Sequence, residues 1–285
     1  MMVTALAPAK INLTLEITGR RADGYHLLRT VMQTVDLYDT VTVCEADQGI
    51  HLRCSGGIPA DQHNTAYKAA ALFLETVGYP GGVSIDVEKR IPSQAGLAGG
   101  SADAAGVLHA LNKLTGANLP VERLCELGER IGADVPFCVH GGTVLCTGTG
   151  TVLTPLPPMP DCAMVIVKPE GGVSTPEAYR LLDSASSLLC PDTDGVCAAL
   201  HNGDLPAIAC RVGNAFEAPL SLPSTAPICA ALYEGGALSA ALSGSGSAVF
   251  GLFTDTEAAT NCAALLSNRY AFATVCRPCS GVLLK

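Results

Sequence analysis

The sequence lacks long apolar runs, clustered basic residues and a recognisable leader. No apolar run reaches the roughly 18 residues that cross a bilayer, and no basic region followed by an apolar core opens the chain. We therefore expect a cytoplasmic protein that does not bind a membrane. The 17 basic residues are dispersed in a chain whose formal net charge is −9. Nucleic-acid binding is not expected either, because it needs Lys and Arg gathered against phosphates.

Paired cysteines are also lacking. The thirteen cysteines are odd in number and lie singly along the chain, so we predict reduced, mostly buried thiols instead of a disulfide framework. Cys276 and Cys279 form the one close pair. Because no second Cys pair or His pair accompanies them, no zinc site is predicted.

The composition and length suit two domains. With 285 residues, 48% of them hydrophobic and 15% charged, each domain can bury a sizeable core. The segment Leu153–Pro160 carries four prolines in eight residues, which neither a helix nor a central strand tolerates. We place the domain boundary there, so that residues 1–157 form one domain and residues 158–285 the other.

Helical and strand-like runs occur in both halves without regular alternation. The first half predicts helices at Thr65–Val77, Ser101–Leu114 and Val121–Ile131, and strands at Ile11–Thr18, Val31–Tyr38, Val41–Glu45 and Val83–Val87. The second half predicts helices at Thr175–Ser184, Gly195–His201, Ala226–Tyr233 and Thr256–Ser267, and strands at Ala163–Val167, Ala237–Ser243, Val249–Phe253 and Phe272–Cys276. The last of these elements are typical of a ferredoxin-like unit, and the irregular order favours the α+β class over a doubly wound sheet.

The most informative segment is Ile91–Ala105, a glycine-rich loop that runs into an alanine-rich helix. Gly96, Gly99 and Gly100 leave the backbone unobstructed, so several N–H groups can converge on an anion at the positive end of the helix. The loop has neither the Gly-Lys-Ser/Thr of a Walker A motif nor the Gly-x-Gly-x-x-Gly of a dinucleotide fold. The segment therefore predicts nucleotide phosphates held in some other fold. Local amide dipoles, a lysine and Mg²⁺ allow an acidic chain to bind ATP.

Two polar groups stand in apolar surroundings. Lys10 and Asn12 share one face of a predicted strand, which is either a sheet edge with a solvated Lys or a strand that aims the Lys into a cleft. Asp134 lies between a helix and Pro136. It either caps a turn, or it accepts or orients the proton of an attacking hydroxyl beside Lys10.

Two turns complete the candidate chemistry. Ser243–Ser247 is a second glycine-rich turn that could close over phosphates, although Gly-Ser turns between strands are common. Tyr25 and His26 follow a tight turn together. They could stack on a heterocyclic base and hydrogen-bond to it, although most such pairs are ordinary surface residues.

The chain resembles the GHMP small-molecule kinases, and the resemblance covers nearly its whole length. The motifs that carry it are the glycine-rich loop, Ala7–Leu13, Arg21–Leu27, Gly132–Phe137 and Leu242–Ala248. The resemblance implies a ribosomal-protein-S5-domain-2-like N-terminal domain and a ferredoxin-like C-terminal domain. It also implies phosphoryl transfer from ATP, with Mg²⁺, to a small-molecule alcohol by a monomer or homodimer. The motifs are most similar to members whose substrate carries cytidine diphosphate. For those members the resemblance implies transfer to the 2-hydroxyl of a methylerythritol unit in non-mevalonate isoprenoid biosynthesis.

The resemblance also implies roles for individual residues. Lys10 and Asp134 match the catalytic pair. Asn12, Tyr25, His26 and Tyr179 match substrate contacts, with the cytosine between Tyr25 and Tyr179 and its edge read by His26. The ATP phosphate loop corresponds to Pro92, Ser93, Gln94, Ala95, Gly96, Leu97, Ala98, Gly99, Gly100, Ser101 and Ala102.

Two departures from the family pattern and one open position remain. Ala98 stands where glycine is usual, and we expect an altered but working loop provided that this residue is not left-handed. No acidic residue matches a magnesium ligand. Ser101 or Asp103 could contribute, or ATP oxygens and water could carry the ion. Asn64 either borders the adenine or serves as the N-cap of the helix that begins at Thr65.

Two other functions stay open at this point. One is a sister GHMP kinase that acts on homoserine, mevalonate or a sugar, against which Tyr25 and His26 argue because such a substrate has no base to stack on. The other is a non-catalytic protein that binds a nucleotide or RNA. The acidity of the chain argues against RNA, and the presence of both Lys10 and Asp134 argues against a silent nucleotide sensor.

Overall fold

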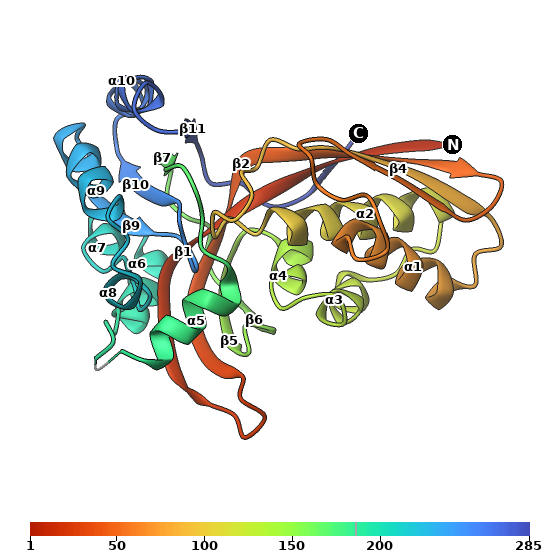
Figure 1. Ribbon diagram of the computed structural model, residues 1–285, viewed down its shortest axis with the longest axis horizontal. Helices are drawn as coiled ribbons and strands as arrows, with labels where there is room; N and C mark the ends of the chain where they lie inside the picture. The colour runs from red at the N-terminus through yellow and green to blue at the C-terminus, as the bar shows by residue number, and fades with distance from the viewer. Residues whose placement is uncertain (186) are drawn as a thin grey trace.

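A computed structural model describes residues 1–185 and 187–285, which form two β-sheets covered by helices (Figure 1). The larger sheet has eight strands in the order β12-β1-β2-β4-β3, and β5, β6 and β8 join it from the side. The smaller sheet has four antiparallel strands in the order β11-β7-β10-β9. This mixture of helices and mostly antiparallel sheets confirms the predicted α+β class.

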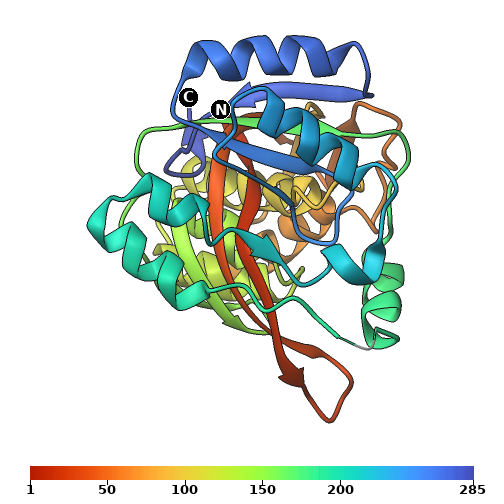
Figure 2. The ribbon, with the colours of Figure 1, turned by 90° about the vertical axis from the view of Figure 1, so that its left-hand side faces the viewer.

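A long hairpin of β1 (Met2–Arg20) and β2 (His26–Ala46) is the backbone of the larger sheet. The sequence predicted a break in the second strand before Val41, but β2 runs through it. Asp39 does not end the strand, because its fully buried carboxylate accepts hydrogen bonds from other segments of the chain. The turn that joins β1 to β2 projects from the body of the molecule (Figure 2).

Helices α1 (Thr65–Val77), α2 (Gly99–Thr115), α3 (Val121–Glu129) and α4 (Val135–His140) cover one face of this sheet (Figure 1). Helix α2 packs closely on β1 and β2 because small residues line it. A side chain on Gly106 would come within 3.0 Å of Val41 and 3.2 Å of Ala7. The small residues thus bring the middle of α2, which follows the glycine-rich loop, against the hairpin.

The smaller sheet has the strand order and the two covering helices of a ferredoxin-like unit. Its strands are β7 (Ala163–Lys168), β9 (Ser239–Leu242), β10 (Val249–Phe253) and β11 (Phe272–Cys276), and its helices are α9 (Thr225–Glu234) and α10 (Thr256–Ser267). The predicted bounds of β10, β11 and α10 agree with the structure. Apolar alternation and the Asp255 N-cap of α10, whose side chain accepts from the Glu257 N–H, explain that agreement.

The other elements are β3 (Ile50–Cys54), β4 (Gly82–Glu88), β5 (Thr143–Gly148), β6 (Val152–Pro155), α5 (Thr175–Asp183), α6 (Thr193–Asn202), α7 (Leu205–Ala209), β8 (Gly213–Asn214), α8 (Glu217–Leu220) and β12 (Leu283–Leu284). Of these elements, the sequence predicted β4, α5 and α6 to within two residues at each end, and it did not predict the rest. The first residues of the proline-rich segment lie in β6, which among the described strands pairs with β5 alone, and residues 156–160 form neither helix nor strand.

Both β8 and β12 pair with β1. The second half of the chain therefore returns to the larger sheet, and the division at residue 157 stays a prediction.

Two predictions about the thiols and the membrane were tested in part. All thirteen cysteines are free, and only Cys190 and Cys210 are exposed. Within residues 1–185 and 187–285 no group of three or more His, Cys, Asp or Glu side chains could hold a metal ion. No helix in the described part of the chain has the length and apolar character that crossing a membrane requires.

Candidate active site

A cavity of about 1690 Å³ opens where the phosphate loop (Pro92–Ala102) meets β1, the start of α4, helix α5 and the turn at 243–247. Pockets for one small molecule usually measure about 300–1,000 Å³. The cavity is therefore large enough for two ligands at once, which a transfer between them requires. All the predicted substrate contacts and the predicted catalytic pair line this cavity.

The phosphate loop places the start of α2 at the cavity. Gly96 has a φ of 72°, and a Cβ on it would lie 1.9 Å from the Ser243 carbonyl oxygen. Only glycine fits there. Gly99, Gly100 and Ser101 line the cavity at the positive end of the helix dipole, which is where an anion is stabilised.

Ala98 has left-handed backbone, with φ 57° and ψ 30°, directly before α2. The condition attached to the sequence prediction, that this residue is not left-handed, is therefore wrong. The conformation costs an L-residue about 1 kcal/mol relative to glycine. At Ala98 the chain passes from the loop into α2. The Ala98 carbonyl accepts from the Ala102 N–H inside the helix, whereas the preceding Leu97 carbonyl accepts from the Lys10 N–H of β1.

We expect Ala98→Gly to stabilise the protein by about 0.5–1 kcal/mol and to leave turnover at least unchanged, because the glycine relieves a left-handed backbone. Ala110→Gly is the control, because Ala110 lies inside α2 with helical backbone. It should destabilise by about 1 kcal/mol or more, because glycine in a helix interior loses more conformational entropy and the fully buried methyl group is removed. Chemical denaturation measures both. Destabilisation by Ala98→Gly would contradict the inference that the left-handed backbone of Ala98 is strained.

Lys10 is buried in the centre of β1 and is only 3% exposed. The alternative of a solvated lysine at a sheet edge is therefore wrong. Its Nζ donates to Asn12 Oδ1 at 2.6 Å, and Asn12 Nδ2 donates to Thr30 Oγ1 at 2.8 Å. Asn12 thus orients the ammonium group, and its predicted contact with the substrate stays a prediction.

Asp134 is the partner of Lys10 across the cavity. Its Oδ2 lies 3.9 Å from Lys10 Nζ, and the side chain is 36% exposed. Asp134 precedes α4, but its side chain makes no capping hydrogen bond to that helix. Asp134 thus holds the N-cap position of α4 through its backbone carbonyl, which accepts from the Cys138 N–H, and its side chain is left to the cavity. A carboxylate that faces the cavity beside a buried ammonium can accept or orient a hydroxyl proton.

The turn Ser243–Ser247 packs directly on the phosphate loop. Ser243 Oγ donates to the Gly96 carbonyl at 3.0 Å, and the Ala248 N–H donates to the Ala95 carbonyl at 3.1 Å. Asn214, which the sequence analysis missed, fixes this turn, since its Nδ2 donates to the carbonyls of Leu242 and Gly244 at 2.8 Å. A lone Asn carries no local signal for such a role.

The predicted aromatic contacts line the cavity from the β1–β2 turn, the start of β2 and helix α5. His26 stacks on Tyr179, with ring centroids 4.7 Å apart and planes at 27°. Asp183, which sequence reasoning also missed, places its Oδ1 2.7 Å from His26 Nε2. Burial, with a smaller effect of Asp134, raises the pKa of Tyr179 to about 12, so the phenol stays neutral. Tyr25 is 66% exposed on the rim.

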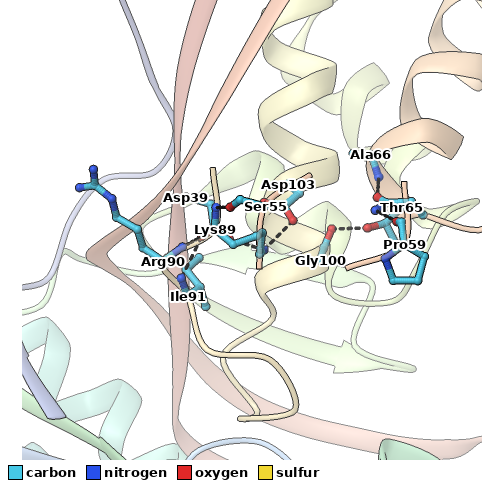
Figure 3. A network of polar contacts seen from close by, with 11 residues as sticks. Asp39, Ser55, Pro59, Thr65, Ala66, Lys89, Arg90, Ile91, Gly100 and Asp103 are labelled. Atoms are coloured by element: carbon cyan, nitrogen blue, oxygen red, sulfur yellow. Dashed lines mark hydrogen bonds and ion pairs between the residues drawn. The ribbon is translucent and has the colours of Figure 1, made fainter. Parts of the chain in front are cut away.

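Beneath the phosphate loop lies a buried ionic cluster of Asp39, Lys89 and Asp103 (Figure 3). Lys89 Nζ donates to both carboxylates, and its distance to Asp103 Oδ2 is 2.6 Å. Burial raises the pKa of the Asp103 carboxyl above its usual range, and the Lys89 ammonium opposes that rise. The sequence analysis noticed only Asp103, because the other two carry no motif of their own.

Asn64 is the N-cap of α1, since its Oδ1 accepts from the Ala66 N–H at 2.9 Å. This confirms the capping interpretation, and the residue also lines the cavity. The next residue ties α1 to α2, because Thr65 Oγ1 donates to the Gly100 carbonyl at 2.6 Å (Figure 3).

The residues near the phosphate loop suit a magnesium ion that arrives with its nucleotide. Asp103 Oδ2 is taken by Lys89, and Oδ1 is buried. Ser101 lines the cavity and is half-buried. Mg²⁺ keeps several waters and needs only one or two protein ligands when phosphates hold it, so these residues fit an ion carried mainly by ATP oxygens.

Two family descriptions match the chain. "GHMP kinases N terminal domain" matches residues 64–142, and "GHMP kinases C terminal" matches residues 196–271. The 4-diphosphocytidyl-2-C-methyl-D-erythritol kinase of Clostridium botulinum (strain Eklund 17B / Type B) is 43% identical over 269 residues, which cover 93% of this chain and 95% of the relative. The enzyme of the same name from Caldicellulosiruptor saccharolyticus is 46% identical over 253 residues, covering 87% of each chain.

Solved structures agree with the sequence relatives. A crystal structure of 4-(cytidine 5'-diphospho)-2C-methyl-D-erythritol kinase superimposes with a TM-score of 0.82 at 36% identity, covering 96% of this chain and 98% of that one. A homoserine kinase from Cytophaga hutchinsonii gives a TM-score of 0.79 at 22% identity, covering 100% and 97% of the two chains. The latter likeness concerns the fold alone.

Proposed function

The chain belongs to the GHMP kinases, in the family of the 4-diphosphocytidyl-2-C-methyl-D-erythritol kinases. We propose that its cavity holds ATP and 4-diphosphocytidyl-2-C-methyl-D-erythritol, and that the γ-phosphoryl group of ATP is transferred to the 2-hydroxyl of that alcohol. The reaction is a step of non-mevalonate isoprenoid precursor synthesis. The observation that carries the proposal is the meeting of the Lys10–Asp134 pair with the phosphate loop in one cavity with room for both substrates.

Asp134 and Lys10 act on the acceptor hydroxyl. The bond from the acceptor oxygen to the γ-phosphorus forms, the bond to the β-phosphate oxygen breaks, and the hydroxyl proton passes to the Asp134 carboxylate. Lys10 stabilises the negative charge on the reacting oxygens, because its buried ammonium is held at the cavity by Asn12. A loose phosphoryl transition state needs this positioning more than it needs a strong base.

The phosphate loop and the 243–247 turn hold the nucleotide. The start of α2 presents backbone N–H groups and a positive dipole to the phosphates, and Gly244–Gly246 lie across from it. A magnesium ion bound with ATP would neutralise the phosphates and polarise the γ-phosphorus. Ser101, which lines the cavity, is the side chain that would help to hold that ion.

The aromatic residues that line the cavity select the acceptor. Tyr25 and Tyr179 stack on the cytosine, while His26, held by Asp183, reads its edge. His26 now covers one face of Tyr179 and must move aside for the base to stack there. We also propose that the protein is cytoplasmic, that it is a monomer or homodimer, and that it binds no nucleic acid. The free thiols fit a reducing compartment.

Turnover with a panel of alcohols tests the function. Purified protein with Mg-ATP should release ADP with 4-diphosphocytidyl-2-C-methyl-D-erythritol and not with methylerythritol phosphate, CMP, homoserine or mevalonate. Turnover with homoserine or mevalonate instead would keep the fold and overturn the acceptor. No turnover with any of these alcohols would favour a non-catalytic protein.

We expect Tyr25→Ala to raise the KM for the cytidyl acceptor about 5–100-fold with little change in kcat, because one stacked base contributes about 1–3 kcal/mol to binding. Tyr233→Ala is the control, because Tyr233 is 52% exposed on α9 and does not line the cavity. Steady-state kinetics at saturating ATP measure both. A fall in kcat with unchanged KM in Tyr25→Ala would contradict base stacking.

A further inference from the structure

The buried ionic cluster of Asp39, Lys89 and Asp103 joins three segments that are far apart in the sequence. Asp39 lies inside β2, Lys89 follows the end of β4, and Asp103 lies in the second turn of α2. Lys89 and Asp103 therefore stand on either side of the phosphate loop. The side chains are almost inaccessible, with exposures of 0%, 6% and 6%.

Asp39 fixes the entry of the loop. Its Oδ1 accepts from the backbone N–H groups of Arg90 at 2.5 Å and Ile91 at 2.8 Å. Ile91 is 2% exposed and directly precedes Pro92. Since proline restricts the residue before it, the chain enters the loop in one direction set by a single carboxylate on the neighbouring strand.

Lys89 fixes the exit of the loop. Its ammonium bonds to Asp103 on α2 as well as to Asp39 on β2. A Cβ on Gly99 would lie 3.3 Å from Lys89 Nζ, so the first turn of α2 rests on the ammonium group. The positive charge thus lies beneath the helix start that faces the phosphates, and the ends of the loop are held by one set of contacts.

Stability alone does not explain these charges. Burying two carboxylates and one ammonium group loses their hydration, and well-packed apolar residues often replace such clusters without loss of stability. Asp103 Oδ1 has no hydrogen-bond partner within the described residues. A cluster that keeps an unsatisfied oxygen but fixes both ends of a ligand-binding loop is better explained by the geometry that it imposes on the loop.

We propose that Asp39, Lys89 and Asp103 are positioning residues that set the affinity of the phosphate loop for ATP. The proposal rests on the proposed function, because it assigns the loop to the nucleotide. The cluster holds both ends of the loop, and Lys89 and Asp103 also line the cavity. Its loss should therefore weaken nucleotide binding and leave binding of the cytidyl acceptor unchanged. A general structural role would weaken both.

Calorimetric titration of Lys89→Met with a non-hydrolysable ATP analogue, and separately with the acceptor, tests the proposal. We expect the Kd for the nucleotide to rise at least 10-fold and the Kd for the acceptor to stay within 2-fold. Arg90→Met is the matched control, because the Arg90 side chain is exposed and, within the described residues, forms an ion pair with Glu88 and with no other carboxylate. Its nucleotide affinity should equal that of the unaltered protein.

Asp103→Asn keeps the shape of the side chain and covers the case in which Lys89→Met does not fold. It should raise the nucleotide Kd several-fold, and combined with Lys89→Met it should add less than its separate effect. Unchanged nucleotide affinity, or equal losses for both ligands, would overturn the proposal. Turnover of the unaltered protein, measured on the same preparation, separates this outcome from failure of the proposed function.

Discussion

Asp134→Asn should lower kcat by at least about 10³-fold, while the affinity for ATP stays within a few-fold. A positioned acid–base group contributes about 10²–10⁴-fold to kcat, and the charge of Asp134 also balances that of Lys10. The amide has the same size but cannot accept the proton as a carboxylate does. It leaves the buried Lys10 ammonium with Asn12 as its remaining close partner. Single-turnover kinetics and nucleotide titration measure the two quantities.

The control for this substitution is Asp47→Asn, which changes an exposed carboxylate between β2 and β3 that does not line the cavity. It should leave both turnover and affinity unchanged. If Asp134→Asn retained normal turnover, the assignment of the proton acceptor would be wrong. The ion pair with Lys10 would then be a structural contact.

Lys10→Met should reduce kcat by about 10²–10³-fold, the usual cost of removing one donor from a site that stabilises charge in the transition state. Methionine keeps most of the length of the buried side chain, so packing in β1 is largely preserved. The loss should fall on the chemical step, since Lys10 Nζ lies 3.9 Å from Asp134 Oδ2 at the reacting end of the cavity.

Lys113→Met is the matched control for that lysine, because it is exposed in the last turn of α2. Its turnover should be unchanged. If Lys10→Met instead raised the KM for ATP by about 10²–10³-fold and left kcat unchanged, the lysine would act in nucleotide binding and not in stabilising the transition state.

Local chemistry explains what the sequence predicted well. Asn64 ahead of α1 gives a capping signal, and Gly78 in left-handed backbone gives its stop, so that helix was predicted with its observed bounds. The glycine-rich loop was recognised from Gly96, Gly99 and Gly100, which stand directly ahead of an alanine-rich helix. Each of these signals lies within a few residues of the feature that it specifies.

Long-range partners explain what the sequence did not predict. The sequence predicted one strand that ends at Tyr38 and another that begins at Val41, so Asp39 fell in the gap between them. Its carboxylate is satisfied by residues 90 and 91, about fifty positions further along the chain. The other two missed residues also have partners far along the chain. Asp183 contacts His26, and Asn214 donates to the carbonyl of Gly244. No local pattern marks such residues before the fold brings them together.

The central claim, phosphoryl transfer to a cytidyl alcohol in this cavity, is tested most directly by phosphorus-31 NMR of the complete reaction. With Mg-ATP and 4-diphosphocytidyl-2-C-methyl-D-erythritol, one new phosphomonoester should form for each ADP, while the diphosphate of the acceptor stays intact. The same mixture with Asp134→Asn should show neither product over the same time. Inorganic phosphate in place of the monoester, or equal product from the variant, would contradict the account.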